Sequence, residues 1–463
     1  MTTLRPTRPA AAEDAPNPGP KHPGGPPGRE RQAGTPNPAG SERLPERPLR
    51  LTILDDNPFV RTHDGSVHPR AATFHHFAEA VVRCGPFAPA RYLVPVAPLR
   101  PGEADPRLRA VDEQWLTVLP TRPFHGVAGY LARLPRMSRA NWPVIRTAVA
   151  EADLVWIKAP ASNALLAAAA CRVEGVPRFT YVAGSARAVV GGQRRRGPGR
   201  LPATGAALAY DAVTRLLCAT GPGLELDADL FTSSLSLEDV SATTPEADPP
   251  GPGEPWRIAW AGRMAGEKGL DDLFLAMADL RRAGRSMELI LIGDGPDRAR
   301  LEARAAQLGL ADTIRWLGYI GDRGAYFAAL REAHLFCFPS HAEGVPKVLV
   351  EAMAAGLPVI ATDVGAVRGL LAQGRRGRLV PAGDPQTLTV ELAAMMDDEL
   401  TRQALRQRGL SWAADRTSEA QALRLVAWMR RAFPALPWPG LAGLPPGSNA
   451  AGDSLGDPSE AAA

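Results

Sequence analysis

Two glutamates, Glu343 and Glu351, flank the step Gly-Val-Pro-Lys at 344–347, inside an otherwise apolar stretch. Charged side chains in a stretch of core composition indicate either a site for a polar ligand or a surface carboxylate and a helix ion pair. Proline suits a first helical position, so we expect a helix to begin near Pro346. Free N–H groups at a helix start bind anions, so the stretch predicts an anion site with a carboxylate on either side of it.

Each carboxylate has an expected partner. Glu351 lies about one turn inside the expected helix, where its oxygens can accept hydrogen bonds from both hydroxyls of a vicinal diol such as a ribose. Glu343 stays in the loop, where we expect it to hold hydroxyls of whatever is attached to the phosphate. Arg263 and Lys268 follow a predicted strand in WRIAWAGRM and add two positive charges. The combination predicts a site for a phosphate, a ribose and a sugar.

Lysine is scarce in this chain. It occurs only at Lys21, Lys158, Lys268 and Lys347, and arginine fills the other basic positions. Because lysine is a compact point charge and arginine a planar fork, these positions are candidates for function. A lysine in the first turn of a helix opposes the helix dipole, so Lys347 predicts an anion nearby.

The elements that must position these residues alternate regularly in the second half. Strands are predicted in WRIAWAGRM, MELILIGDGPD, IRWLGYI, HLFCFPS and PVIATDVG, with a helix between each pair. This alternation predicts a doubly wound parallel sheet, whose ligands bind outside the carboxyl ends of the strands. The candidate residues follow those strand ends.

The first half predicts a second α/β unit. Strands are expected in LRLTILDDN (49–57), ADLVWIKAP (152–160) and VPRFTYVAGS (176–185), with an alanine-rich helix after the second. The fold class is therefore α/β, with two Rossmann-like domains facing across a cleft. The expected organisation has an acceptor-side domain at 48–240 and a nucleotide-sugar domain at 256–417, joined by a linker at 241–255. A helix at 418–433 is expected to pack back towards the first domain. Disordered tails are expected at 1–47 and 434–463.

Several stretches, in this order, resemble one known family. They are AGRMAGEKGL, LIGDGP, WLGYI, FPSHAEGVPKVLVEAMAAGLPVIATDVGA and GRLVPAGDP, covering about 256–385. Together they are similar to the retaining glycosyltransferases of family 4 (glycosyl transferases group 1), which have the GT-B fold. The resemblance implies that Arg263 and Lys268 bind the donor diphosphate, that Glu343 contacts the donor sugar, and that Glu351 holds the ribose.

The resemblance also implies a wider donor site. The backbone at 344–346 would contact the phosphate or the sugar, and the backbone at 319–320 the base. Asp294 is equally well explained by its Gly-Asp-Gly turn, and His341 as a loop histidine. With Arg263, Lys268 and Glu343 as the catalytic set, the expected donor-binding residues are Gly262, Gly293, Asp294, Tyr319, Ile320, His341, Gly344, Val345, Pro346, Lys347, Val348 and Glu351.

The first half departs from the family pattern. DDNPF stands where many members have a glycine pair, and Lys158 stands near the place of a histidine pair. Lys158 either replaces a histidine near the donor sugar or extends from a strand end to solvent. Gly369 occupies the place of a later family glutamate. The acceptor-side candidates are Asn57, His63, Asp64, Gly65 and Lys158; the alternative for 55–77 is a polar loop that leads into a helix.

Composition excludes several classes. The net charge of +4 does not indicate nucleic acid, and the four dispersed cysteines predict reduced thiols without a disulfide or zinc site. No run of 18 apolar residues is present. The triplet DAD at 227–229 fits the Asp-x-Asp of metal-dependent glycosyltransferases, but we expect solvated surface there and no metal. The arginines at 194–196 and Arg200 would attract anionic lipid or are simply solvated.

The expected function is a retaining, metal-independent glycosyltransferase of the cytoplasm or of the inner face of the membrane. It would need no cofactor beyond a nucleotide-diphosphate sugar, and would act on a glycan, lipid-linked or small-molecule acceptor. Two alternatives stay open: a sugar-nucleotide epimerase of the same fold, and a partner subunit that keeps the donor site without transfer.

Overall fold

The computed structural model describes residues 47–70, 74–100, 109–123, 126–183, 200–227, 229–241, 249–251 and 253–439. Nearly all of both predicted tails, the arginines at 194–196 and most of the predicted linker lie outside these residues. Arg200 is the first residue of a helix.

The first sheet is a parallel Rossmann sheet with an added hairpin. Its parallel strands run in the order β5-β4-β1-β6-β7-β8, which is 3-2-1-4-5-6 when the hairpin is left out. Strands β2 and β3 form the antiparallel hairpin, and β2 pairs with the end of β4. The bounds are β1 (Leu51–Leu54), β2 (Phe59–Arg61), β3 (Val67–Pro69), β4 (Ala90–Pro98), β5 (Leu116–Thr121), β6 (Leu154–Ala159), β7 (Arg178–Val182) and β8 (Gly223–Glu225).

The helices of this half are α1 (Phe74–Cys84), α2 (Gly126–Ala150), α3 (Ala164–Glu174), α5 (Arg200–Ala219) and the short α6 (Leu237–Ser241). Helices α2 and α3 contribute to one apolar core and α1 to another, so the sheet carries a separate core on each face.

The second sheet has the same order without an insertion. Its six strands are all parallel and run β11-β10-β9-β12-β13-β14, again 3-2-1-4-5-6. They are β9 (Trp256–Ala261), β10 (Met287–Ile292), β11 (Ile314–Gly318), β12 (Leu335–Phe338), β13 (Val359–Thr362) and β14 (Arg378–Val380). Strands β12 and β13 are buried along their whole length, which fits strands that are covered on both faces.

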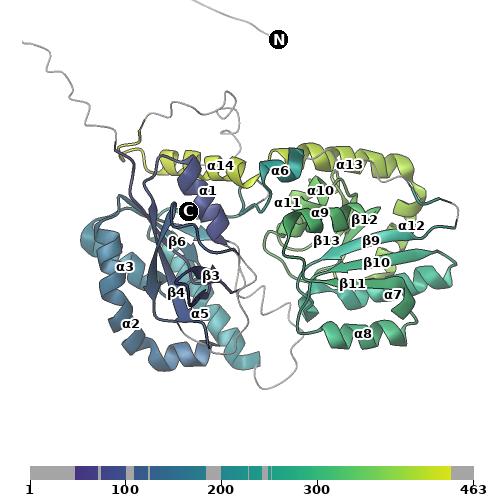
Figure 1. The fold of residues 1–463 in the computed structure, drawn as a ribbon, viewed down its shortest axis with the longest axis horizontal. Helices are drawn as coiled ribbons and strands as arrows, with labels where there is room; N and C mark the ends of the chain where they lie inside the picture. Colours follow the sequence, from purple (N-terminus) through teal and green to yellow (C-terminus); the bar gives the residue numbers. More distant parts are fainter. Residues whose placement is uncertain are drawn as a thin grey trace, which may run out of the picture. The chain divides into compact units, whose positions relative to one another are not determined.

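Helices cover both faces of this sheet. Figure 1 shows α7 (Leu270–Arg282) and α8 (Arg298–Gln307) on one side, and α9 (Arg323–Arg331) and α10 (Lys347–Ala354) on the other. The two faces have separate apolar cores. The remaining helices are α11 (Val367–Leu370), α12 (Pro385–Asp397) and α13 (Glu399–Ala414).

The last helix, α14 (Ser418–Ala432), packs on the first half of the chain. Leu425, Trp428 and Met429 belong to the core that contains α1 and the first sheet. The ring of Trp428 lies 5.3 Å from that of Phe179 in β7. Figure 1 shows α14 beside α1.

The α/β class with two Rossmann-like sheets is confirmed, and one local prediction needs correction. The helix expected near Pro346 begins at Lys347, and Pro346 precedes its first turn with an extended backbone (φ −76°, ψ 107°). The loop expected after β1 contains the β2–β3 hairpin. Strands of three residues are too short to show an alternating pattern.

Candidate active site

A cavity of about 1110 Å³ opens at the carboxyl ends of the second sheet. The ends of β9, β10 and β11 and the starts of α9 and α10 contribute to its wall, and so do residues of the first half. This is where an open α/β sheet binds its ligands. The lining residues are Val60, Pro69, Arg70, His76, Leu99, Arg109, Ser233, Ser234, Ala261, Gly262, Arg263, Ile292, Gly293, Asp294, Gly295, Tyr319, Ile320, Gly321, Asp322, Arg323, Tyr326, Lys347, Val348, Glu351 and Ser418.

Lys268 and Glu343 form an ion pair in the loops that follow β9 and β12. Lys268 Nζ lies 2.6 Å from Glu343 Oε1, and both side chains are mostly buried. The hydroxyl of Ser340 donates to the same oxygen at 2.5 Å. The backbone N–H of His341 donates to the carbonyl of Glu267 at 2.7 Å, so the two loops are tied together. Glu343 is therefore held in a fixed position just before α10.

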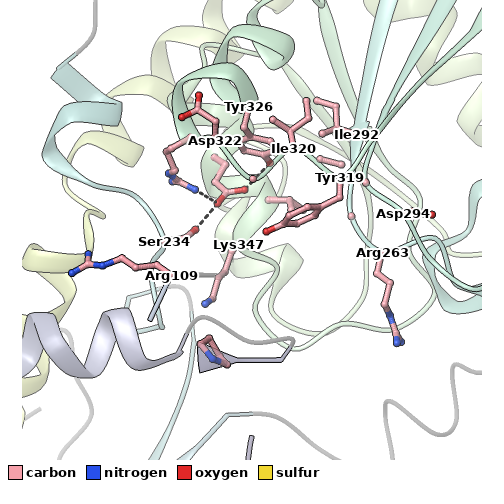
Figure 2. Close-up of a pocket in the computed structure, with 18 of the residues that line it drawn as sticks. Arg109, Ser234, Arg263, Ile292, Asp294, Tyr319, Ile320, Asp322, Tyr326 and Lys347 are labelled. Carbon is pink, nitrogen blue, oxygen red and sulfur yellow. Dashed lines mark hydrogen bonds and ion pairs between the residues drawn. The ribbon is translucent and has the colours of Figure 1, made fainter. Parts of the chain in front are cut away.

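Arg263 lies at one side of the cavity and keeps an exposed guanidinium. Its NH2 is 3.1 Å from Glu267 Oε1, and its side chain is 63% exposed. Figure 2 shows Arg263 and Lys347 on opposite sides of Tyr319. An exposed ion pair of this kind contributes little stability, so the arginine can exchange its partner for an anionic ligand at low cost.

The carboxylate of Glu351 accepts hydrogen bonds from three side chains. The hydroxyl of Ser234 donates to Oε1 at 2.5 Å, Arg323 donates to the same oxygen at 3.1 Å, and the hydroxyl of Tyr326 donates to Oε2 at 2.7 Å. Arg323 also binds Asp239. Burial raises the pKa of Tyr326 well above its usual value, and the charge of Glu351 adds to this, so the phenol keeps its proton and remains a donor. The carboxylate is oriented towards the cavity with one of its four acceptor positions open.

Lys347 begins α10 and points into the cavity (Figure 2). Its side chain is half-buried, and no hydrogen bond or ion pair joins it to another residue in the described part of the chain. Burial lowers the pKa of its ammonium to about 8; Lys158 and Arg323 lower it further, and Glu351 opposes the shift.

Glycines allow the loops at the strand ends to approach one another. Gly293 has φ 132°, and a Cβ there would lie 1.9 Å from the carbonyl oxygen of Gly262. Gly365 has φ 54°, and a Cβ there would lie 2.2 Å from the carbonyl oxygen of Glu343. Any larger residue at 365 would therefore push on the loop that holds Glu343.

The expected donor-side residues fall into two neighbouring groups. The cavity itself is lined by Gly262, Arg263, Gly293, Asp294, Tyr319, Ile320, Lys347, Val348 and Glu351. The loops beside it, outside the lining set, hold Lys268, His341, Glu343, Gly344, Val345 and Pro346. His341 Nε2 lies 2.6 Å from Asp272 Oδ2, and Asp294 accepts from the N–H of Gly295 at 2.8 Å, which is the turn geometry considered for it.

None of the five acceptor-side candidates, all of them described residues, lines the cavity. His63, Asp64 and Gly65 lie in the β2–β3 turn, where Asp64 accepts hydrogen bonds from Thr62 and Ser66, which lower the pKa of its carboxyl to about 2. Lys158 Nζ is 2.7 Å from the buried Asp55.

Asp55 also organises the end of β1. It accepts from Asn57 and from the hydroxyl of Tyr92 at 2.6 Å. Lys158 thus neither stands free at a strand end nor lines the cavity, because it neutralises a buried carboxylate.

Several residues of the cavity wall could not be recognised from the sequence. Arg70, His76 and Arg109 come from the first half, and Ser234, Arg323 and Tyr326 surround Glu351. They are far apart in the chain and form no recognisable motif. Only the packing of the two halves brings them together.

Within the described residues, no group of three or more His, Cys, Asp or Glu side chains is placed to hold a metal ion. No helix in the described part of the chain is long and apolar enough to cross a membrane.

The fold and the site together define a protein with the GT-B architecture. The structure resembles sucrose-phosphate synthase from Thermosynechococcus elongatus with a TM-score of 0.58 and 19% identity, over 84% of this chain and 100% of that one. It resembles WaaG, a glycosyltransferase involved in lipopolysaccharide biosynthesis, with a TM-score of 0.56 and 18% identity, over 82% of this chain and 99% of that one.

Residues 245–412 match the model of the family Glycosyl transferases group 1. One curated relative is the phosphatidyl-myo-inositol mannosyltransferase of Mycobacterium leprae, which is 39% identical over 137 residues, or 29% of this chain and 36% of the relative. Another is the 2-deoxystreptamine glucosyltransferase of Streptomyces kanamyceticus, which is 32% identical over 158 residues, or 34% of this chain and 41% of the relative. The chain thus spans less than half the length of these relatives.

Proposed function

We propose that this protein is a retaining, metal-independent glycosyltransferase that moves a sugar from a nucleotide-diphosphate sugar to a glycan, lipid-linked or small-molecule acceptor. The synthesis of a bacterial polysaccharide, glycoconjugate or natural product would be its setting, in the cytoplasm or at the inner face of the membrane. The names of the relatives, which transfer mannosyl and glucosyl groups, support a hexosyl donor. The observation that carries the proposal is the Lys268–Glu343 pair, fixed before α10 and beside the cavity of Glu351.

The proposed chemistry follows from where charge develops. When the glycosyl bond breaks, negative charge grows on the departing diphosphate oxygen. Arg263, Lys268 and the free N–H groups at the start of α10 would stabilise that charge, and preorganised groups of this kind usually supply the largest catalytic effect. Glu351, oriented by Tyr326 and Arg323, would hold the ribose, and Glu343 the hydroxyls of the sugar.

Retention is proposed to occur by substitution at the front face. The bond from the anomeric carbon to the diphosphate breaks, and the acceptor oxygen forms its bond on the same face. The departing phosphate oxygen takes the acceptor proton, so no side chain need act as a base. No metal is required in this scheme, because the leaving charge meets fixed cations.

The test is hydrolysis and transfer with a panel of UDP-, GDP- and ADP-sugars, with and without EDTA. An active transferase hydrolyses one donor slowly without an acceptor, and EDTA leaves the rate unchanged. Glu343→Ala should abolish turnover while circular dichroism still shows a folded protein, with some loss of thermal stability because Lys268 loses its partner. Full turnover by that variant would reject the site, and no hydrolysis of any donor would favour an inert partner subunit.

A further inference from the structure

The cavity has two cationic ends, and a single diphosphate accounts for only one. Arg263 lies on one side of Tyr319, while Lys347 lies on the other side together with Arg109 (Figure 2). On the proposed function, the donor diphosphate lies between Arg263, Lys268 and the start of α10. The ammonium of Lys347 points away from Arg263, towards the wall that the first half of the chain provides.

That wall is basic. Apart from Ser234, which donates to Glu351, and its neighbour Ser233, the described residues that the first half contributes to the lining are Val60, Pro69, Arg70, His76, Leu99 and Arg109, which include two arginines and no carboxylate. His76 is half-buried, and its buried Nε2 has no hydrogen-bond partner among the described residues. A neutral imidazole can donate one hydrogen bond from its N–H. The wall therefore offers positive charge and an unused polar nitrogen.

The cations of this end act on one another. Burial lowers the pKa of His76 to about 4, and the charges of Arg109, Lys347 and Arg323 contribute to the shift. Among these cations, Arg109 has Asp112 at 3.3 Å and Arg323 has Asp239 and Glu351. Lys347 has no ion pair in the described part of the chain, and the charge of Glu351 offsets its burial only in part, so this half-buried ammonium has a position open for an anion.

We propose that Lys347, with His76 and Arg109, binds a phosphate or carboxylate group of the acceptor, so that the enzyme uses an anionic acceptor and not a neutral or amine-bearing one. The inference rests on the proposed function, because it assigns the diphosphate to the other end of the cavity. The position of the site supports an acceptor group, since two of its three residues come from the half of the chain opposite Glu351 and α10. An anion there would pair with Lys347 and engage the unused imidazole nitrogen.

Calorimetry on the full-length protein tests the proposal in two steps. First, UDP, GDP and ADP are titrated to find the nucleoside diphosphate that binds. The protein saturated with that nucleotide is then titrated with glucose 6-phosphate and with glucose, as a matched anionic and neutral pair. We expect glucose 6-phosphate to bind at least ten times more tightly than glucose.

Variants separate the two ends. Lys347→Met should weaken glucose 6-phosphate binding at least tenfold and nucleotide binding by a much smaller factor, since the backbone N–H groups at the start of α10 remain in place, and Lys347→Arg should restore most of the loss. Lys268→Met should weaken nucleotide binding and have a much smaller effect on glucose 6-phosphate binding. Because Arg109 is 63% exposed, Arg109→Met serves as a second variant that leaves packing intact, with an expected loss of about three- to fivefold for glucose 6-phosphate.

Equal binding of glucose and glucose 6-phosphate would overturn the proposal. So would an equal loss of nucleotide and of glucose 6-phosphate binding in Lys347→Met. A preference for a nucleotide-glucuronate over a nucleotide-glucose donor that depends on Lys347 would also overturn it, because the anion would then belong to the donor sugar. If the parent protein binds no nucleoside diphosphate, the proposed function fails. Lys347-dependent binding of glucose 6-phosphate would then still establish the anion site by itself.

Discussion

At the scale of residues, the ion pair between Lys268 and Glu343 serves both packing and chemistry. Both side chains are mostly buried, with 19% and 11% of their surface exposed. Replacement of a buried ion pair by apolar side chains is often neutral or stabilising, but removal of one member leaves the other charge without compensation. Loss of stability and loss of catalysis can therefore be separated by removing both charges.

Lys268→Met should lower the free energy of unfolding by about 1–3 kcal/mol, because Glu343 then keeps only the hydroxyl of Ser340 as a partner among the described residues. Lys268→Met combined with Glu343→Gln should recover most of that loss, since the second charge is gone, and should stay inactive. Denaturant unfolding and donor hydrolysis measure the two effects. Recovery of activity in the double variant would show that the pair is only structural.

Lys347 should cost stability at neutral pH. Its folded-state pKa of about 8 lies below its ordinary value near 10.5, so the unfolded chain binds the proton more tightly. The cost is complete below pH 8 and declines as the pH rises from about 8 to 10.5. Glu351, Lys158, Arg323 and His76 are the charged or titratable groups that act on it.

Lys347→Met should accordingly be more stable than the parent at pH 7, by about 1–3 kcal/mol, and the difference should shrink at pH 10. Unfolding by denaturant at the two pH values measures it. A difference that stays constant from pH 7 to pH 10 would mean that the ammonium is well solvated in the folded protein.

At the scale of elements, the loops after the second-sheet strands are spaced by glycine and not by side chains. Gly365, which begins the connection after β13, touches the backbone of Glu343, so the strand-end loops fix one another. The regular alternation of this sheet was readable in the sequence because each strand is an apolar run and each helix is amphipathic. The contact between Gly365 and Glu343 could not be predicted from the sequence, because only the folded sheet brings these two residues together.

Gly365→Ala should reduce turnover on the order of 10²-fold, because the added carbon displaces the loop that holds Glu343. Gly383→Ala is the matched control: its φ of 75° carries a similar backbone cost of about 1–2 kcal/mol, but a Cβ there meets nothing within 4 Å. The control should lose some stability and keep its turnover. Equal turnover in the two variants would contradict the proposed role of the loop.

At the scale of the whole molecule, the first half shows where sequence reasoning stops. The parallel strands β1, β6 and β7 were predicted, because their apolar runs are clear. The hairpin was not predicted, and neither were helices α2 and α5. Helix α2 contains Pro135 and Pro143, and the first turns of α5 contain Pro202 and Gly205. Proline and glycine are unfavourable inside helices, so the sequence argued against both. The wall of Arg70, His76 and Arg109 depends on the packing of three separate segments, so no local pattern could reveal it.

Helix α14 joins the end of the chain to the core of the first half. Trp428→Ala should lower the free energy of unfolding by about 3–5 kcal/mol, because a nearly buried ring against Phe179 is lost. Leu400→Ala on α13, where the side chain is 80% exposed, should change it by less than about 0.5 kcal/mol. Thermal and denaturant unfolding compare the two. A small effect of Trp428→Ala would show that α14 is only loosely attached.

The position of α14 has a consequence for biosynthesis. A ribosome makes the first Rossmann unit early, yet the helix that covers its α1 face is made only after the whole second unit. Until then, the apolar surface that Trp428 and Leu425 will cover stays open to water and to other nascent chains. We expect a gene fragment that encodes the first unit alone to give insoluble protein, whereas co-production with a peptide of the α14 sequence should rescue it.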